Sequence, residues 1–514
     1  MKKVNKAVNV VRYSQKTSRY LTRITWMSCA AILSSCAVGP DYRSQEAPTV
    51  TTYTTSAMPE KTVAAPVDLG SSQYFVAGRI DAEWWKVFGS GKLDHLIEQA
   101  LQASPSLKAA RATLEQAKYS YEAQAGATLY PQVSGNSGAS RQRVNKAAFG
   151  QPGESTTYNL FNAGVNVGYN LDLFGGNRRM LESLAAEAEH QKYQLETARL
   201  VLVSNLLTTA IKQAQLAMQL KASQQMLRAQ KEQLKITRKR FLLGAGSQSE
   251  VLALQTATEQ SRANIPQLRN SLEQQYHLLA LLAGFAAGNG EVPTFTLSDF
   301  TLPTLLPIMI PSELVRQRPD IRASESLLQA ANARYGMSIA KRYPQINLSA
   351  DIGSQALTTA GLFGAGSLVW GLAGQLTQPL FKKGLIAESD AAMAGFNAAE
   401  ANYRQTVLQA FRNVADVLRS LDNGALTLAA QAAANASAEK SLKLVDQEYK
   451  LGAANYLEVL SAQQQLQLNS MNLIEAQARR LIDTTALYQA MGGQTKLPVQ
   501  AAVYSFDTPV MIVD

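Results

Sequence analysis

The side chains that most often do acid–base or metal chemistry are few in this chain and far apart in its sequence. The 514 residues include three histidines and two cysteines. His95, His190 and His277 all lie in stretches with helical periodicity, so we expect them to be surface or packing residues. His190 and His277 would fall on different long helices, which leaves a chance metal pair open. The sequence shows no phosphate-binding glycine loop, nucleophile elbow or Cys/His cluster, so we expect no enzyme, metal or cofactor.

The thiol of Cys36 has a more definite chemistry, because it follows an export signal. Residues 1–35 carry seven Lys or Arg and no acidic residue, and they end in a short apolar run. This order is typical of a secretory signal peptide, and a run of about ten residues is too short to span a bilayer as a helix. The run ends in Leu-Ser-Ser-Cys at 33–36, which looks like a bacterial lipobox. In such precursors the cysteine becomes the first mature residue and receives lipid on its thiol and new amine. The alternative is an ordinary signal with a cysteine nearby.

Removal of this signal changes what the composition implies. Cys29 leaves with the signal, so the mature chain keeps Cys36 alone and forms no disulfide. The net charge falls from +10 to about +3 (10 − 7), so the pI of 9.3 gives no argument for nucleic acid as a partner. No window of 18 or more apolar residues follows the signal. We therefore expect any membrane spanning to be done by β-strands.

The chain repeats its landmarks after about 210 residues, a period that defines its structural unit. The tripeptide Tyr-Pro-Gln occurs at 130–132 and 343–345, and Leu-Gly-Ala occurs at 243–245 and 451–453. The period is too long for a solenoid repeat and long enough for half a protein. We therefore expect a pseudo-symmetric molecule with two halves of one plan.

Each half contains two segments in which apolar or small residues alternate with polar ones. The segments cover 132–145, 157–174, 345–357 and 367–381. A period near two over such lengths is typical of transmembrane β-strands, with apolar side chains outward and polar ones inward. Four ordinary soluble strands are the alternative.

Each half also contains a long helical segment and a shorter returning one. Both long segments lack proline, and the first also lacks an interior glycine, so at 1.5 Å per residue each predicts a rod of about 100 Å. Apolar residues recur in the returning segments at three- and four-residue spacing, which indicates helical hairpins with coiled-coil packing. The long segments cover 176–243 and 383–451, the returning segments 247–285 and 455–491, and a further helix is expected from Pro105 to about Thr128.

These elements predict a domain order along the chain. Trp84 and Trp85 begin the folded body as anchors against its core. The ranges are a lipoprotein signal peptide (1–35), a lipidated N-terminal tether (36–80), a first structural repeat (81–290), an inter-repeat linker (291–310), a second structural repeat (311–495) and a C-terminal extended tail (496–514).

Four strands cannot close a barrel by themselves, since the smallest single-chain examples have about eight. An open sheet edge is not tolerated in lipid, because each unpaired backbone group there costs several kcal/mol. Copies of the chain must therefore share one barrel, and the helical rods would continue it as a cylinder. The expected fold class is an internally duplicated membrane α+β protein.

Several motifs, taken together and in order, resemble one known family. They are Cys-Ala-Val-Gly-Pro-Asp-Tyr at 36–42, Trp84-Trp85 with Phe88, Arg-Pro-Asp-Ile-Arg at 318–322, and the paired Tyr-Pro-Gln and Leu-Gly-Ala. The chain is similar over essentially its whole mature length to the outer membrane factor lipoproteins of tripartite efflux pumps, the TolC-like, NodT-type outer membrane efflux family. The resemblance implies a homotrimer with a shared twelve-stranded barrel in the outer membrane and a long α-helical periplasmic tunnel.

The resemblance also implies a function and partners. These are a passive exit duct from periplasm to outside for drugs or other small toxic compounds, a periplasmic adaptor, an inner-membrane efflux pump and outer-membrane lipid, without nucleic acid. An outer-membrane conduit of type I protein secretion would share all of these features and stays open as the alternative. A structural coiled coil would explain the helices but not the paired strand segments.

Site residues follow from the same resemblance. The docking tips for the adaptor would be Leu243, Gly244, Ala245 and Gly246 in the first half, and Leu451, Gly452, Ala453 and Ala454 in the second. These glycines can also serve only to close the hairpins. The family's periplasmic constriction includes acidic side chains near the second tip, which makes Asp446 the candidate gate; the alternative is a solvated surface acid.

Overall fold

The computed structural model describes residues 37–46, 49–145, 150, 152–288 and 292–493. The predicted signal peptide, Cys36 and the predicted tail at 496–514 lie outside these residues. The chain divides into two units, and each unit combines segments from both sequence halves. Unit 1 contains residues up to Gln45 together with 113–191 and 324–403, and unit 2 contains 46–112, 192–323 and the residues from Arg404 onward.

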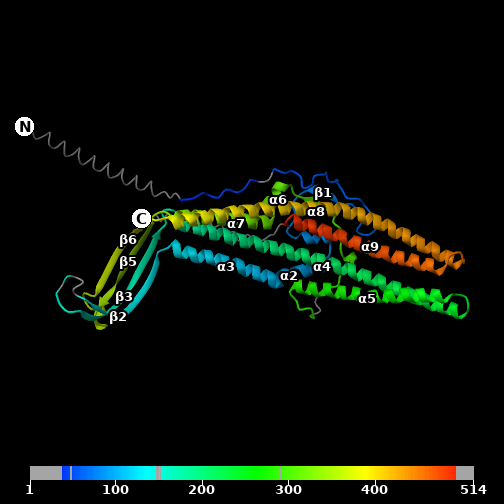
Figure 1. The fold of residues 1–514 in the computed structure, drawn as a ribbon, viewed down its shortest axis with the longest axis horizontal. Coiled ribbons are helices and arrows are strands. Elements are labelled where there is room, and N and C mark those ends of the chain that lie inside the picture. The colour runs from blue at the N-terminus through cyan, green and yellow to red at the C-terminus, as the bar shows by residue number, and fades with distance from the viewer. Residues whose placement is uncertain (1–36, 47–48, 146–149, 151, 289–291, 494–514) are drawn as a thin grey trace, which may run out of the picture. The chain divides into compact units, whose positions relative to one another are not determined.

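Unit 1 is built on a four-stranded antiparallel sheet with the order β2-β3-β5-β6 (Figure 1). The second hairpin therefore follows the first directly, and β3 pairs with β5. The sheet leaves β2 and β6 as its edges among the described strands. The strands are β2 (Gln132–Val144), β3 (Thr156–Leu171), β5 (Gln345–Ala356) and β6 (Leu368–Thr377). All four predicted strand segments are confirmed.

Two of these strands end before their predicted segments do. The segments at 157–174 and 367–381 were expected to be strand throughout, but β3 ends at Leu171 and β6 at Thr377. Pro379 has no amide hydrogen to donate to a ladder, which explains the early end of β6. After β3, the carboxylate of Asp172 accepts a 2.8 Å hydrogen bond from the backbone N–H of Arg178 and so belongs to the start of the next helix.

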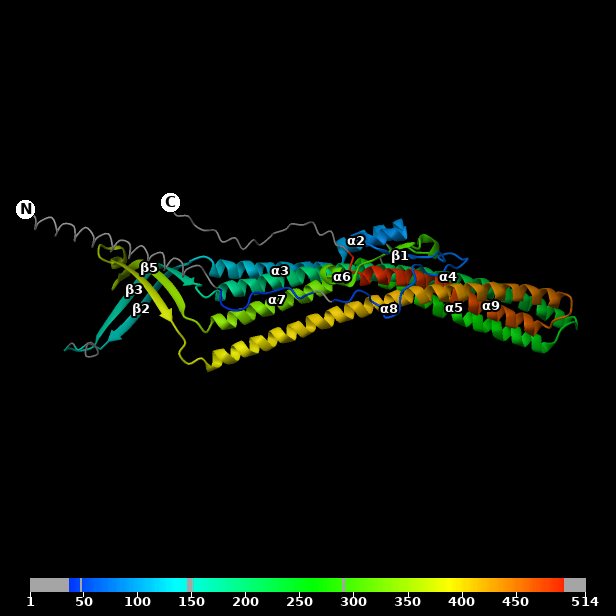
Figure 2. The ribbon, with the colours of Figure 1, turned by 90° about the horizontal axis from the view of Figure 1, so that it is seen from above.

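The predicted helical hairpins are confirmed with boundaries within a few residues. The long helices α4 and α8 run without interruption, and α8 continues through Gly395 and Gly424. The helices are α3 (Pro105–Thr128), α4 (Gly176–Leu242), α5 (Gln248–Ala283), α7 (Pro319–Ala340), α8 (Lys383–Lys450) and α9 (Tyr456–Ala490). In unit 2, the α4–α5 and α8–α9 turns end the bundle on the same side (Figure 2). No helix among the described residues has the length and apolar character needed to cross a bilayer.

Unit 2 also contains small elements that the sequence analysis did not predict. A parallel two-stranded sheet joins β1 (Tyr74–Ala77), within the expected tether, to β4 (Leu305–Ile308), within the expected linker. The remaining elements are the helices α2 (Gly91–Ala103) and α6 (Pro311–Gln317) and short 3-10 turns at Trp84–Phe88 and Leu297–Asp299; unit 1 has one at Ala360–Phe363.

An aromatic cluster anchors the core of unit 2. Trp84, Trp85 and Phe88 are almost fully buried, as the prediction of two tryptophan anchors required. The Trp84 ring stacks on Tyr488 of α9, with 5.3 Å between the ring centroids. A pair of stacked aromatic rings stabilises the fold by more than the burial of its apolar surface alone. The 3-10 turn is thereby fixed to the last long helix of the chain.

Candidate functional site

Each helical hairpin in unit 2 ends in the same backbone turn. At the first, the N–H of Gly244 donates to the carbonyl of Phe241 (2.9 Å) and that of Ala245 to Arg240 (2.8 Å). At the second, Gly452 donates to Tyr449 (3.1 Å) and Ala453 to Glu448 (2.8 Å). This bond pair is the Schellman motif, which satisfies the last carbonyls of a helix and needs a left-handed residue.

Glycine supplies the left-handed conformation at both turns. The φ angle is 74° at Gly244 and 79° at Gly452. A Cβ atom added at either position would meet no other atom within 4 Å, so it is backbone conformation and not crowding that calls for glycine. A capping box then starts each returning helix, with Ser247 and Glu250 at the first and Asn455 and Glu458 at the second.

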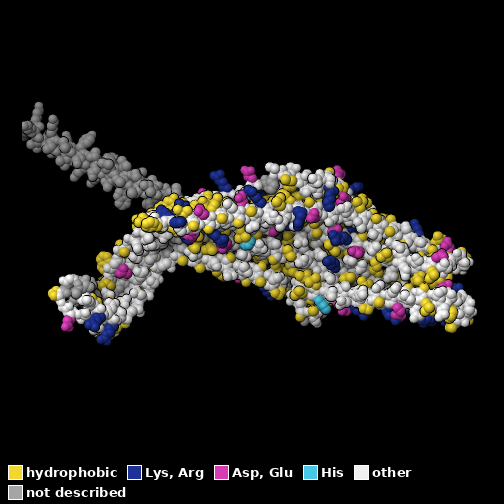
Figure 3. Space-filling view, in the orientation of Figure 1, with side chains coloured by type: hydrophobic (Ala, Val, Ile, Leu, Met, Phe, Trp, Pro, Cys, Tyr) yellow, Lys and Arg dark blue, Asp and Glu magenta, His cyan; other side chains and the backbone are white. Residues whose placement is uncertain are grey.

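The two turns present apolar side chains to solvent. Leu243 and Leu451 precede the glycines and are 83% and 84% exposed, and Leu242 is 80% exposed. Hydrophobic side chains are visible at the surface of both tips in Figure 3. Exposed apolar groups that gather at one place on a protein are typical of a contact site for another molecule. We call residues 243–246 and 451–454 the first and second tips.

The two hairpins are packed against each other just behind the tips. Leu234, Leu254, Tyr456 and Leu460 belong to one buried apolar cluster there. Arg240 of α4 donates a short hydrogen bond to the hydroxyl of Tyr449 on α8, and its guanidinium lies 5.4 Å from that ring's centroid. Because the cluster contains residues of both hairpins, the hairpins are packed together close to their tips.

Asp446 lies on α8, one and a half turns before the second tip. Its carboxylate accepts a 2.5 Å hydrogen bond from Lys450, one helical turn further along. The Asp446 side chain is 43% exposed and the Lys450 side chain 70% exposed, so solvent screens the pair. The geometry places the acid close to the tip and accessible.

The sheet of unit 1 has two chemically different faces. Residues paired across the strands place Val165 opposite Ile352 and Ile352 opposite Trp370, which makes one face apolar. The other face carries mainly Asn, Ser, Gln and Gly. Its members include Gln132, Ser134, Asn136, Asn162, Asn166, Asn170, Asn347, Ser349, Asp351, Gln355 and Gln375. This separation matches a strand with one side in lipid and one side in water.

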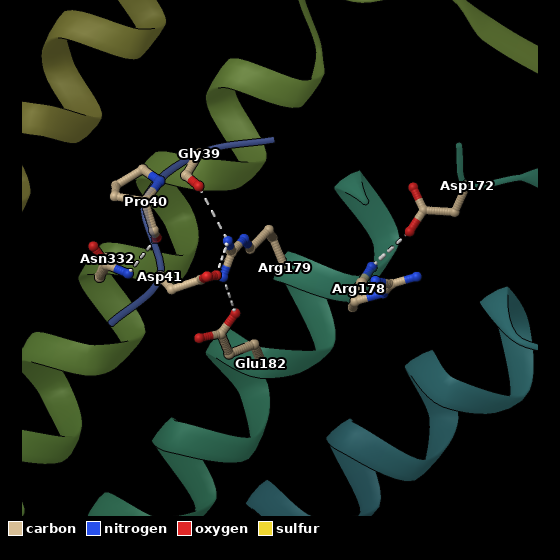
Figure 4. A network of polar contacts seen from close by, with 8 residues as sticks. All are labelled: Gly39, Pro40, Asp41, Asp172, Arg178, Arg179, Glu182 and Asn332. Carbon is tan, nitrogen blue, oxygen red and sulfur yellow. Dashed lines mark hydrogen bonds and ion pairs between the residues drawn. The ribbon is translucent and has the colours of Figure 1, made fainter. Parts of the chain in front are cut away.

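The N-terminal segment of unit 1 is held by a buried arginine (Figure 4). Arg179, near the start of α4, donates to Asp41 (2.6 Å), to the carbonyl of Gly39 (3.2 Å) and to Glu182 (2.7 Å). Asn332 of α7 donates to the carbonyl of Pro40 (2.9 Å). We call these contacts the N-terminal clasp.

The partners of Arg179 offset the cost of burying its charge. Burial lowers the pKa of the guanidinium, but hydrogen bonds to Glu182 and Asp41 outweigh burial and leave the pKa above its usual value. Crowding adds to the fit, because a Cβ atom on Gly39 would lie 2.7 Å from the backbone of Gly336. The sequence analysis did not predict this clasp. Its one signal was the Gly-Pro-Asp sequence after Cys36.

The Arg-Pro-Asp-Ile-Arg motif also has a structural role, in unit 2. Arg318 donates to Asp320 (2.8 Å) and to the carbonyl of Ala490 (2.9 Å), which ends α9. The motif therefore ties the start of α7 to the end of the last helix.

The three histidines lie on α2, α4 and α5. Within the described ranges, no group of three or more His, Cys, Asp or Glu is placed to hold a metal ion.

Comparison with known proteins identifies the class to which these features belong. The sequence matches the outer membrane efflux protein family over residues 96–285 and 310–493. The cation efflux system protein CusC of Escherichia coli O6:H1 is 29% identical over 479 residues, which cover 90% of this chain and 97% of that protein. The pyoverdine export outer membrane protein OpmQ of Pseudomonas aeruginosa is 29% identical over 443 residues, covering 84% of this chain and 93% of that protein.

A solved structure agrees with this result. The outer-membrane channel OprN superposes with a TM-score of 0.79 at 26% identity, over 89% of this chain and 99% of that one. The predicted fold class is thereby confirmed, with four strands per chain in a shared trimeric barrel and long helices that form a periplasmic tunnel. Channels of this kind act as trimers with adaptor and inner-membrane pump partners. The chain belongs to the outer membrane efflux protein family and is the outer-membrane channel component of an efflux system.

Proposed function

We propose that the chain is a lipid-anchored, passive exit duct for drugs or other small toxic compounds, which a periplasmic adaptor opens by binding its two tips. The observation that carries this proposal is the repetition of the tip. Two different local sequences build the same Schellman turn and capping box, and both place a leucine in solvent. A turn that only reverses the chain does not require an exposed leucine. A surface that binds an adaptor does, because exposed apolar side chains are buried when the partner binds.

The polar face of the sheet supports a duct for small solutes. Its side chains are mostly neutral amides and hydroxyls, with glycines between them. Such groups offer both hydrogen-bond donors and acceptors and favour no single charge. CusC is named for cation efflux and OpmQ for pyoverdine export. We therefore infer that the inner-membrane pump, and not this channel, selects the compound.

The tip proposal is tested by changing Leu243 and Leu451 to serine together. The double variant is expected to keep its trimer, because both side chains are solvent-exposed in the chain. It should lose most drug resistance in a strain that lacks the wild-type gene. A photo-reactive residue at position 245 should cross-link to the adaptor when Leu243 and Leu451 are both present. In the double variant this cross-link should be lost.

A matched control uses another exposed leucine. Leu281, near the end of α5, is 69% exposed and lies away from the tips, and Leu281→Ser is expected to leave resistance unchanged. Full resistance and an unchanged cross-link in the double variant would show that the tips are only hairpin turns. A strain that lacks the gene for this chain separates the two functions. If that strain keeps normal drug resistance but no longer releases a secreted protein, the result favours protein secretion over efflux.

We further propose that Asp446 forms part of the closed periplasmic constriction. In a trimer the residue occurs three times near the second tip, and three carboxylates around one axis attract cations. Lys450, which forms an ion pair with Asp446, lies on the same helix. Each chain therefore forms this ion pair without a residue from a neighbouring copy.

Channel conductance tests this role. Asp446→Ala should change the single-channel conductance in planar bilayers and reduce the cation preference, because it removes negative charge from the proposed constriction. Asp416→Ala is the matched control, since Asp416 also lies on α8 and pairs with a basic residue four positions away, Arg412. Equal conductance in wild type and the Asp446 variant would make the residue a surface acid.

A further inference from the structure

The two edges of the sheet carry a matched pair of aromatic residues. The fold class brings β6 of one copy beside β2 of the next. Phe381 follows β6 and is fully exposed, and Tyr130 precedes β2 and is 65% exposed. Both side chains lie in unit 1, at opposite edges of one sheet, so they cannot meet within a chain.

The internal duplication shows what this pair does elsewhere in the same chain. Phe174 follows β3 as Phe381 follows β6, and Tyr343 precedes β5 as Tyr130 precedes β2. Inside the sheet, β3 pairs with β5, and the Phe174 ring stacks on Tyr343 with 4.9 Å between centroids and 22° between planes. The pair of Phe174 and Tyr343 therefore forms its stack within one chain, where the two halves of the sheet meet.

We propose that Phe381 of one copy stacks on Tyr130 of the neighbouring copy, and so repeats between chains the stack that Phe174 and Tyr343 form within a chain. The occupant of this surface is a second copy of the chain. An aromatic pair of this kind stabilises beyond its buried area. The ring of copies would then hold six aromatic stacks at the base of the barrel, alternating within and between chains.

We call the connections from strand to helix at Phe174 and Phe381 the first and second junctions. The N-terminal segment packs against the first junction only, which leaves the second one free for a neighbouring copy. At the first junction, the N–H of Val38 donates to the carbonyl of Phe174 (3.1 Å), and a Cβ atom on Gly175 would lie 2.8 Å from Ala37. A glycine after the phenylalanine is thus needed for the segment to dock. Lys382 holds this place after Phe381. The segment therefore fits one junction, and the other is left to the next copy.

Cross-linking in trans tests the contact. Tyr130→Cys and Phe381→Cys are expressed together as two differently tagged chains and treated with a short bifunctional thiol reagent. We expect a covalent dimer that carries both tags. Each single variant alone should stay monomeric on a denaturing gel, because each of its interfaces holds one introduced thiol, and this control also reports any reaction of Cys36.

A second pair shows whether the reagent has the reach. Phe174→Cys with Tyr343→Cys in one chain should give an internal cross-link, detected by mass spectrometry without a dimer. If this internal link forms and the trimer is intact on a native gel, but the mixed chains give no covalent dimer, the proposal is wrong.

Heat resistance of the trimer gives an independent measurement. Phe381→Ser and Tyr130→Ser should each lower the temperature at which the trimer dissociates, and Phe381→Tyr should leave it near the wild-type value. Because residues in contact are not additive, the double serine variant should lose little more than either single one. Two fully additive losses would contradict the stack.

Discussion

At the scale of single residues, Arg179 shows what sequence reasoning misses. Its partners Gly39 and Asp41 lie far away in the chain and are brought to it only by the fold. No local pattern marks such a residue, whereas the turn glycines Gly244 and Gly452 are marked by their place between helical segments. The planar guanidinium suits the task, because its several donors can satisfy two carboxylates and a carbonyl at once.

The clasp predicts that Arg179 controls access to the N-terminal segment. Arg179→Met would remove three hydrogen bonds and leave Glu182 partly buried without its cation. We expect a loss of about 1–3 kcal/mol, and each 1.4 kcal/mol opens the segment about tenfold more often. Trypsin should then cut faster after the exposed Arg43, which is read as the rate of appearance of the shortened chain.

Arg178→Met is the matched control for this change. Arg178 is the adjacent exposed arginine, and its bond to Asp172 comes from the backbone N–H, which the substitution keeps. The control should leave the cleavage rate at its wild-type value. Equal rates in the Arg179 and control variants would mean that the crowded glycines, and not the arginine, hold the segment.

At the scale of elements, patterns within one segment could be predicted and pairings between distant segments could not. The long helices, the returning helices and all four strands of the large sheet follow from periodicity, Gly and Pro. Strands β1 and β4 have four residues each, which is too short to show a period, and their pairing joins Tyr74 to Leu305. Their stability comes from the partner strand and from burial of Leu306, and neither is written in the local sequence.

The candidate site divides in the same way. The turns were predicted from glycines between helical segments, which permit a left-handed backbone, and their role as docking tips was predicted only from the resemblance to the family. The packing between the hairpins was not predicted, since the contact of Arg240 with Tyr449 joins helices that are distant in the sequence. The role of Asp446 stays a prediction, because an acid on a helix face has the same sequence signature whether or not it lines a constriction.

At the scale of the whole molecule, the duplication places similar elements in unequal surroundings. The junction at Phe174 is occupied by the chain's own N-terminal segment, and the junction at Phe381 is open. One chain thus offers a closed and an open version of the same contact. A closed ring of copies needs both, since every open edge in lipid must find a partner.

The molecule also has two independent ties to the membrane, the strands and the proposed lipid on Cys36. Wild-type chain should incorporate labelled palmitate, and Cys36→Ser should not. Because the strands of a barrel are themselves buried in the bilayer, any Cys36→Ser chain that is exported should still form trimers in the outer-membrane fraction. Cys29→Ser is the matched control and should keep the label, since Cys29 lies in the predicted signal, before the proposed lipidation site. If the wild-type chain takes up no label and is cut at another residue, the signal is an ordinary signal peptide. The N-terminal clasp would then bind an N-terminal segment that carries no lipid.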